Sequence, residues 1–205
     1  MKTVDVKADK DRAVSLAVEA LRRGGVLIYP TDTLYGLGAD ARNKSAISRL
    51  MEIKGRSAGL VFSVMLGDVG ELVRLVKVRG GLRPVLKMLP GPYTFVFPSK
   101  EKLPDGVVGP GIGIGVRIPD HPVALKIAMD FKAPIITTSV NRTGEPPLTK
   151  SSEIVEMFSD EVDLFLDSGD IAGAPSTVIS FVSHPPQILR KGAGDTVFLS
   201  EIDGF

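Results

Sequence analysis

The stretch from Val26 to Gly36 joins a short apolar run to a polar turn, and it limits the folds that this chain can adopt. Val26–Tyr29 is typical of a buried strand, and the turn after it carries Thr31, Asp32, Thr33 and Tyr35. Such a strand fixes the position of the following loop, and α/β proteins place ligands at strand ends of this kind. A second apolar run, Ala133–Thr137, ends in the same way, with hydroxyl and amide side chains at Thr137–Asn141.

Segments of helical and strand character are mixed along the rest of the chain. Apolar residues at helical spacing predict helices near residues 13–21, 44–53, 68–76, 82–89, 121–131 and 152–158. Short apolar runs predict further strands at 61–66, 93–97, 115–118, 162–166, 177–182 and 187–190. Because the order is not a strict βαβ alternation, we predict an α/β fold of the α+β type, with a twisted mixed sheet and flanking helices.

Length and composition suit a single domain over residues 1–205. The net charge of +1 argues against a generally basic nucleic-acid binder but leaves room for a local basic patch. The chain has no cysteine and two histidines, His121 and His184, which excludes thiolate chemistry and argues against a multi-histidine metal site. No apolar run approaches the ~20 residues of a membrane span, and the N-terminus has no signal-peptide core, so we expect a cytoplasmic protein without a membrane partner.

Several polar residues point to a ligand, although each also has a plainer explanation. Lys54 and Arg56 follow a predicted helix, where they are either solvated cations favoured by the helix dipole or a clamp for phosphate oxygens. The hydroxyls and amide of Thr137–Asn141 form either a turn cluster or part of a ligand site. Arg117, inside a short apolar strand, faces either solvent or a carboxylate ligand.

Other residues say less when taken one at a time. Ser176 and Arg190 begin and end predicted strands, and the glycine-rich stretch 106–115 lacks the lysine of a Walker-type phosphate loop. The sequence contains no G-x-S-x-G elbow and no evident pair of nucleophile and base. An enzyme with this sequence would therefore work by positioning and electrostatics.

In this order, these pieces resemble the YrdC/Sua5 family of threonylcarbamoyl-AMP synthases. The matching segments are 29–38 (YPTDTLYGLG), 53–56 (IKGR), 89–97 (LPGPYTFVF), 116–122 (VRIPDHP), 137–147 (TTSVNRTGEPP), 176–180 (STVIS) and 188–194 (ILRKGAG). They span nearly the whole chain, and their combination is specific although no single piece is. Because the chain ends soon after the last segment, it is similar to the short form of the family.

The resemblance implies a twisted sheet around a large, positively charged cavity, and it implies roles for residues of this chain. Those at nucleotide-binding positions are Lys54, Arg56, Leu60, Gly113, Ser139, Asn141, Pro147 and Arg190. Lys54 and Arg56 are also expected to be the catalytic residues, since they would hold the ATP phosphates. Those at threonine-binding positions are Thr33, Met65, Arg117, Thr137 and Ser176, and Arg117 would pair with the carboxylate of the amino acid.

One segment departs from the family pattern. Leu60 and Met65 stand where relatives commonly carry polar side chains. We expect backbone groups of Leu60 to contact the nucleotide and Met65 to pack against the methyl group of threonine. The departure leaves room for a different affinity or substrate preference.

The activity implied by the resemblance joins L-threonine, bicarbonate or CO2, and ATP into threonylcarbamoyl-adenylate and releases pyrophosphate. The adenylate supplies the t6A modification of tRNA through a tRNA threonylcarbamoyl transferase complex. Mg2+ is expected to enter bound to ATP and to help stabilise phosphate charge, with no metal site in the protein itself.

Two other functions are open on the sequence alone. One is an RNA-binding module that uses the basic cavity, for which a salt-sensitive contact with tRNA is expected. The other is a relative that forms carbamoyl-adenylate from carbamoyl phosphate. The near-neutral charge counts against the first, and the absence of cysteine and of a larger zinc-containing chain counts against the second.

Overall fold

The computed structural model describes residues 1–55, 61–100, 103–108 and 113–202 of the chain. Its helices are α1 (Lys10–Arg22), α2 (Lys44–Lys54), α3 (Val69–Leu75), α4 (Pro122–Phe131) and α5 (Ser151–Phe158), with 3₁₀ helices η1 (Gly80–Met88) and η2 (Val197–Glu201). Its strands are β1 (Lys2–Asp5), β2 (Leu27–Tyr29), β3 (Gly36–Gly38), β4 (Ser63–Met65), β5 (Tyr93–Phe97), β6 (Ile114–Arg117), β7 (Ile135–Ser139), β8 (Leu164–Asp167), β9 (Thr177–Ser180) and β10 (Gln187–Arg190).

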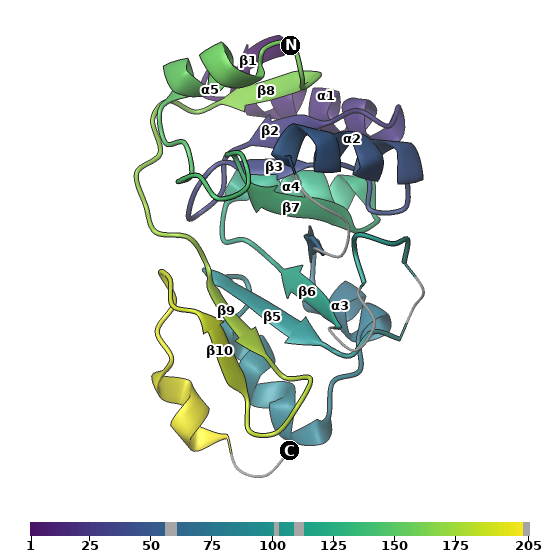
Figure 1. Ribbon diagram of the computed structural model, residues 1–205, viewed down its shortest axis with the longest axis vertical. Helices are drawn as coiled ribbons and strands as arrows, with labels where there is room; N and C mark the ends of the chain where they lie inside the picture. Colours follow the sequence, from purple (N-terminus) through teal and green to yellow (C-terminus); the bar gives the residue numbers. More distant parts are fainter. Residues whose placement is uncertain (56–60, 101–102, 109–112, 203–205) are drawn as a thin grey trace.

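The ten described strands join one mixed sheet in the order β1-β8-β2-β3-β7-β4-β6-β5-β9-β10. The sheet contains parallel pairs, such as β2 with β8 and β5 with β9, and antiparallel pairs, such as β3 with β7 and β4 with β7. Figure 1 shows the helices flanking this twisted sheet. The helices α1, α2, α4 and α5 lie around the strands β1, β8, β2, β3 and β7, and α3 lies beside β5 and β6. The predicted twisted mixed sheet with flanking helices is confirmed.

The strand β2 shows how the sheet separates two buried layers. Leu27 and Tyr29 pack into one hydrophobic cluster, which lies under α1 and α4. Val26 and Ile28 pack into the other, which includes the apolar face of α2. Successive side chains of a strand point to opposite faces, so a short apolar run can be buried on both sides.

The sequence patterns missed or misjudged three elements. The strand β1 is polar and mostly exposed, and it is held by parallel pairing with β8 at the edge of the sheet. The strand β3 reads Gly-Leu-Gly, and glycine is depleted in strands, so it gave no strand signal. Residues 80–88 form a 3₁₀ helix with Pro84 inside it, where proline cannot supply an N–H to an α-helical ladder.

In the described part of the chain, every helix is too short or too polar to cross a membrane.

Burial of Tyr29 leads to a prediction about stability at high pH. The side chain is fully buried, and this burial raises the pKa of Tyr29 to about 12. In the unfolded chain the group ionises near its ordinary value of 10.0, so between pH 10 and 12 the unfolded state loses a proton that the folded state keeps. The stabilising contribution is therefore complete below pH 10 and is lost as the pH rises to 12, by about 2–3 kcal/mol in total.

Tyr29→Phe should make this alkaline loss of stability shallower, as measured by denaturant unfolding across that range. Since the chain has three tyrosines and no tryptophan, the tyrosinate absorbance of the variant can be subtracted from that of the wild type. The difference between the two titration curves should show one group that ionises near pH 12. A difference curve centred near pH 10 would mean that the Tyr29 hydroxyl is hydrated.

Candidate functional site

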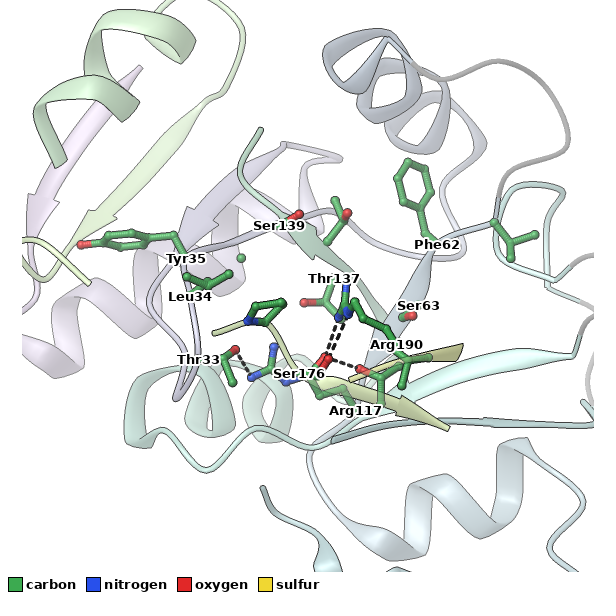
Figure 2. Close-up of a pocket in the computed structure, with 16 residues that line it drawn as sticks. Thr33, Leu34, Tyr35, Phe62, Ser63, Arg117, Thr137, Ser139, Ser176 and Arg190 are labelled. Atoms are coloured by element: carbon green, nitrogen blue, oxygen red, sulfur yellow. Dashed lines mark hydrogen bonds between the residues drawn. The ribbon is translucent and has the colours of Figure 1, made fainter. Parts of the chain in front are cut away.

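A cavity of about 170 Å³ opens where the loop after β2 meets the ends of β6 and β7 and the start of β9. Most of its polar lining is made of side-chain hydroxyls, joined by two guanidinium groups (Figure 2). The lining residues are Thr33, Leu34, Tyr35, Gly36, Val61, Phe62, Ser63, Thr94, Arg117, Thr137, Thr138, Ser139, Pro175, Ser176, Val178 and Arg190. The lining residues that the structure describes include no carboxylate, so the cavity is suited to an anionic ligand.

Arg117, the last residue of β6, is held by the turn that follows β2. Its Nη2 donates to the Thr33 hydroxyl at 2.6 Å and to the Thr31 hydroxyl at 3.3 Å. The same nitrogen lies 2.5 Å from an Asp32 carboxylate oxygen, and only 10% of the Arg117 side chain and 12% of the Asp32 side chain are exposed. Arg117 therefore lines the cavity rather than facing bulk solvent, and it already has a carboxylate partner within the chain.

A hydrogen bond from Tyr29 positions the hydroxyl of Thr137. The Tyr29 phenol, buried in β2, donates to the Thr137 hydroxyl at 2.9 Å. Thr137 lies in β7, opposite Ser63 of β4 in the sheet register, and both line the cavity. Three strands thus fix one hydroxyl of the site.

Ser176 and Arg190 form a second group of residues that line the cavity. Arg190 donates from Nε to the Ser176 carbonyl and from Nη2 to the Ser176 hydroxyl, each at 3.0 Å. The Ser176 hydroxyl also lies 2.9 Å from the hydroxyl of Thr94 in β5. Figure 2 shows Arg190 and Arg117 reaching toward the same space. Partial burial, followed by the nearby charge of Arg117, lowers the pKa of Arg190, so an anion between them would relieve an unfavourable charge arrangement.

Lys54 lies just behind the Ser139 side of the cavity. Only 2% of this residue is exposed, and its ammonium donates to the Ser139 carbonyl at 2.9 Å and to Asn141 Oδ1 at 2.7 Å. The Ser139 hydroxyl donates to the same Asn141 oxygen at 2.6 Å. The plainer explanation of Lys54 as a solvated helix-end cation is therefore wrong, and the Ser-x-Asn residues are brought together with it.

The loop after β7 keeps this arrangement in place. The backbone N–H of Thr143 donates to the Lys54 carbonyl at 2.8 Å. Arg142 forms an ion pair with Glu161 and lies over the Phe158 ring at 5.0 Å. The amide nitrogen of Asn141 donates to the carbonyls of Arg142 and Glu145, at 2.9 and 2.6 Å. These contacts fix the Asn141 side chain with its oxygen toward Lys54.

The structure thus gathers most of the residues that the sequence singled out. Thr33, Arg117, Thr137, Ser139, Ser176 and Arg190 line one cavity, with Lys54 and Asn141 directly behind it.

Other predicted site residues lie elsewhere. Met65 is fully buried outside the cavity lining, although it lies opposite Arg117 in the sheet register. Gly113 borders β6, and Pro147 lies in the loop before α5; neither lines the cavity. Arg56 and Leu60 lie outside the described residues.

Some residues of the site carried no signal in the sequence. Ser63 and Thr94 sit inside apolar strands, and only their place in the sheet brings them to the cavity. Tyr29 reads as a core aromatic, and its hydrogen bond to Thr137 joins residues 108 positions apart. His121 caps α4 by accepting from the Val123 N–H, as expected for a residue at a helix start, and burial lowers its pKa despite the opposing charge of Asp32.

No group of three or more His, Asp or Glu side chains in the described residues is arranged to hold a metal ion.

The sheet and the cavity define a class: α/β proteins with a pocket lined by hydroxyl and guanidinium groups. The model of the Sua5/YciO/YrdC family, which carries the description "Telomere recombination", matches residues 19–192. The chain therefore belongs to the Sua5/YciO/YrdC family.

Relatives of known sequence include two kinds of protein. The threonylcarbamoyl-AMP synthase of Pyrococcus abyssi is 33% identical over 182 residues, 87% of this chain and 54% of its own length. The protein YciO of Escherichia coli, named as uncharacterized, is 32% identical over 190 residues, 91% of this chain and 92% of its own. This chain thus spans about half of the Pyrococcus protein and nearly all of YciO.

Solved structures agree with this assignment. Pyrococcus abyssi Sua5 complexed with L-threonine superposes with a TM-score of 0.85 at 31% identity, covering 93% of this chain and 57% of that one. Escherichia coli YciO superposes with a TM-score of 0.83 at 31% identity, covering 90% of this chain and 91% of that one.

Gly192 offers a test of how the Ser176 side of the cavity is built. A Cβ at this position would lie 2.1 Å from the Pro175 carbonyl oxygen and 2.6 Å from that of Ser176. Gly192→Ala should therefore lower the free energy of unfolding by about 1–3 kcal/mol, as measured by denaturant titration. Gly80→Ala is the matched control, because a Cβ there would meet no atom within 4 Å. Equal effects of the two substitutions would contradict the close approach at Gly192.

Proposed function

We propose that this protein is a threonylcarbamoyl-AMP synthase, which makes threonylcarbamoyl-adenylate and pyrophosphate from L-threonine, bicarbonate or CO2, and ATP. The observation that carries the proposal is the grouping of Arg117, Ser139, Ser176 and Arg190 on one cavity, whose described lining contains no carboxylate. Family membership and the synthase names of relatives such as the Pyrococcus protein support it.

The Arg117 side of the cavity is proposed to hold threonine. The guanidinium of Arg117 and the hydroxyls of Thr33, Thr137 and Ser176 offer donors for a carboxylate and partners for a hydroxyl. The complex of Pyrococcus Sua5 with L-threonine is consistent with this use of the fold.

The side formed by Lys54, Ser139, Asn141 and Arg190 is proposed to hold the nucleotide, with Arg56, Leu60, Gly113 and Pro147 completing it. A buried ammonium and a partly exposed guanidinium are suited to phosphate oxygens. Lys54 and Arg56 are the proposed catalytic residues, acting through charge on the phosphates. Mg2+ would arrive with ATP as part of that substrate and neutralise phosphate charge.

The proposed reaction needs no nucleophile from the protein. The threonine amine adds to CO2 and releases a proton, giving a carbamate. A carbamate oxygen then attacks the α-phosphorus of ATP, and the bond to the departing pyrophosphate breaks. The protein contributes by bringing the carbamate and phosphate together and by stabilising the charge that develops on phosphorus-bound oxygens.

The proposed product is an activated threonylcarbamoyl group destined for tRNA. It would pass to a tRNA threonylcarbamoyl transferase complex in the cytoplasm, with at most weak contact between tRNA and this chain.

Pyrophosphate release tests the proposal. With ATP and Mg2+ present, release is expected only when threonine and bicarbonate are both added, because the carbamate must form before ATP is attacked. Release without threonine, or with carbamoyl phosphate in place of threonine and bicarbonate, would instead favour the carbamoyl-adenylate activity. Salt-sensitive tRNA binding without any pyrophosphate release would favour an RNA-binding module.

Lys54→Ala should reduce pyrophosphate release by about 10²-fold or more, because it removes a fixed positive charge beside the proposed phosphate site. Lys44→Ala is the matched control, since Lys44 is exposed at the other end of the same helix. Thermal melting of both variants shows whether each remains folded. A folded Lys54→Ala protein with wild-type release would contradict the proposed role of Lys54.

A further inference from the structure

The ion pair of Asp32 and Arg117 is unusual because it buries a carboxylate behind Arg117, next to a cavity whose described lining carries only cationic side-chain charges. Both side chains are at least 88% shielded from solvent, as the exposed fractions of 12% and 10% indicate. Three oxygens crowd the Arg117 Nη2, whereas Arg117 Nε and Asp32 Oδ2 are buried without a hydrogen-bond partner among the described residues. Burying two charges with incomplete hydrogen bonding is unfavourable, so simple stabilisation of the fold is a poor reason for this pair.

Arg190, the other cation in the described lining of the cavity, has different partners from Arg117. In the described part of the chain, Arg190 forms hydrogen bonds with Ser176 and no ion pair. The cavity is therefore polarised: its Arg117 end is nearly neutral, and its Arg190 end carries an uncompensated positive charge. A charge difference over such a short distance distinguishes ligands by their own charge distribution.

A simple anion and a zwitterion respond differently to the Arg117 end. An anion is attracted by Arg117 and repelled by Asp32, so it gains little. A zwitterionic amino acid brings both signs, since its carboxylate is attracted by the guanidinium while its ammonium is attracted by the Asp32 carboxylate. A phosphate meets the same opposing charges at the Arg117 end and gains little there, whereas the positive charge of Arg190 attracts it.

We propose that Asp32 is a specificity residue, which makes the Arg117 end of the cavity accept a zwitterionic α-amino acid and reject simple anions. The inference rests on the proposed function, because it concerns the amino-acid end of that same site. It adds a charge requirement that the hydroxyls and Arg117 alone do not impose. If Asp32 merely held Arg117 in place, its loss would weaken every carboxylate ligand alike.

The test compares two ligands that differ only in the amino group, L-threonine and 3-hydroxybutyrate. Their dissociation constants are measured by calorimetry without nucleotide, on the wild type and on Asp32→Asn, which keeps the side-chain shape and removes the charge. Asp32→Asn should weaken L-threonine and strengthen 3-hydroxybutyrate, each on the order of tenfold for a unit charge several ångströms away in a partly buried site. Asp120→Asn is the matched control, because Asp120 is an exposed carboxylate three residues beyond Arg117, and it should leave both constants unchanged.

Opposite changes for the two ligands support the inference. Weakening of both ligands to the same extent would overturn it and leave Asp32 as a positioning residue, and no change in either would overturn it as well. Asp32→Ser, which removes the charge with a smaller side chain, gives the same decision if the asparagine variant does not fold. Failure of the proposed function would look different: pyrophosphate would not be released even though the wild type still preferred L-threonine to 3-hydroxybutyrate.

Discussion

The pairing of β7 with both β3 and β4 is the constraint on which the site depends. Ser139 lies opposite Gly36, and Thr137 lies opposite Ser63, so one five-residue strand sets the position of residues on both of its neighbours. A shift of register by one residue would turn Thr137 and Ser139 to the other face. The cavity is therefore a property of strand pairing before it is a property of any side chain.

Each cation of the site is oriented by oxygens of the chain. The Lys54 ammonium is bound by a carbonyl and an amide oxygen, and the Arg190 guanidinium by the carbonyl and hydroxyl of Ser176. The neutral oxygens of Ser176 orient Arg190 without cancelling its charge, whereas the Asp32 carboxylate does cancel that of Arg117. The site thus has fixed geometry and unequal charge, which is what a reaction between an amino acid and a nucleotide would require.

The sequence predicted the parts of this structure that depend on local pattern. The strand at Val26–Tyr29 and the helix α2 follow from the spacing of apolar residues, and in the structure Asn43 caps α2 by accepting from the Ala46 N–H. The family resemblance brought Thr33, Thr137 and Ser176 to one site.

What the sequence did not predict depends on contacts between distant residues. The bonds from Tyr29 to Thr137 and from Arg117 to Asp32 join separate segments, and no local rule selects those partners. Met65 was expected beside threonine, but the structure places it outside the cavity lining; its role stays a prediction. The polar strand β1 exists only because β8 offers it an edge.

The cavity lies between segments that are far apart in the chain, from Thr33 near its start to Arg190 near its end. A ligand that touched both would connect the β2 loop to the β9–β10 hairpin in the way that a crosslink does. Its binding energy would then oppose any fluctuation that separates the two parts of the sheet. Amide hydrogens in both parts, although remote from one another in sequence, would then exchange with solvent more slowly. Filling one small cavity would make the two parts of the sheet open as one cooperative unit.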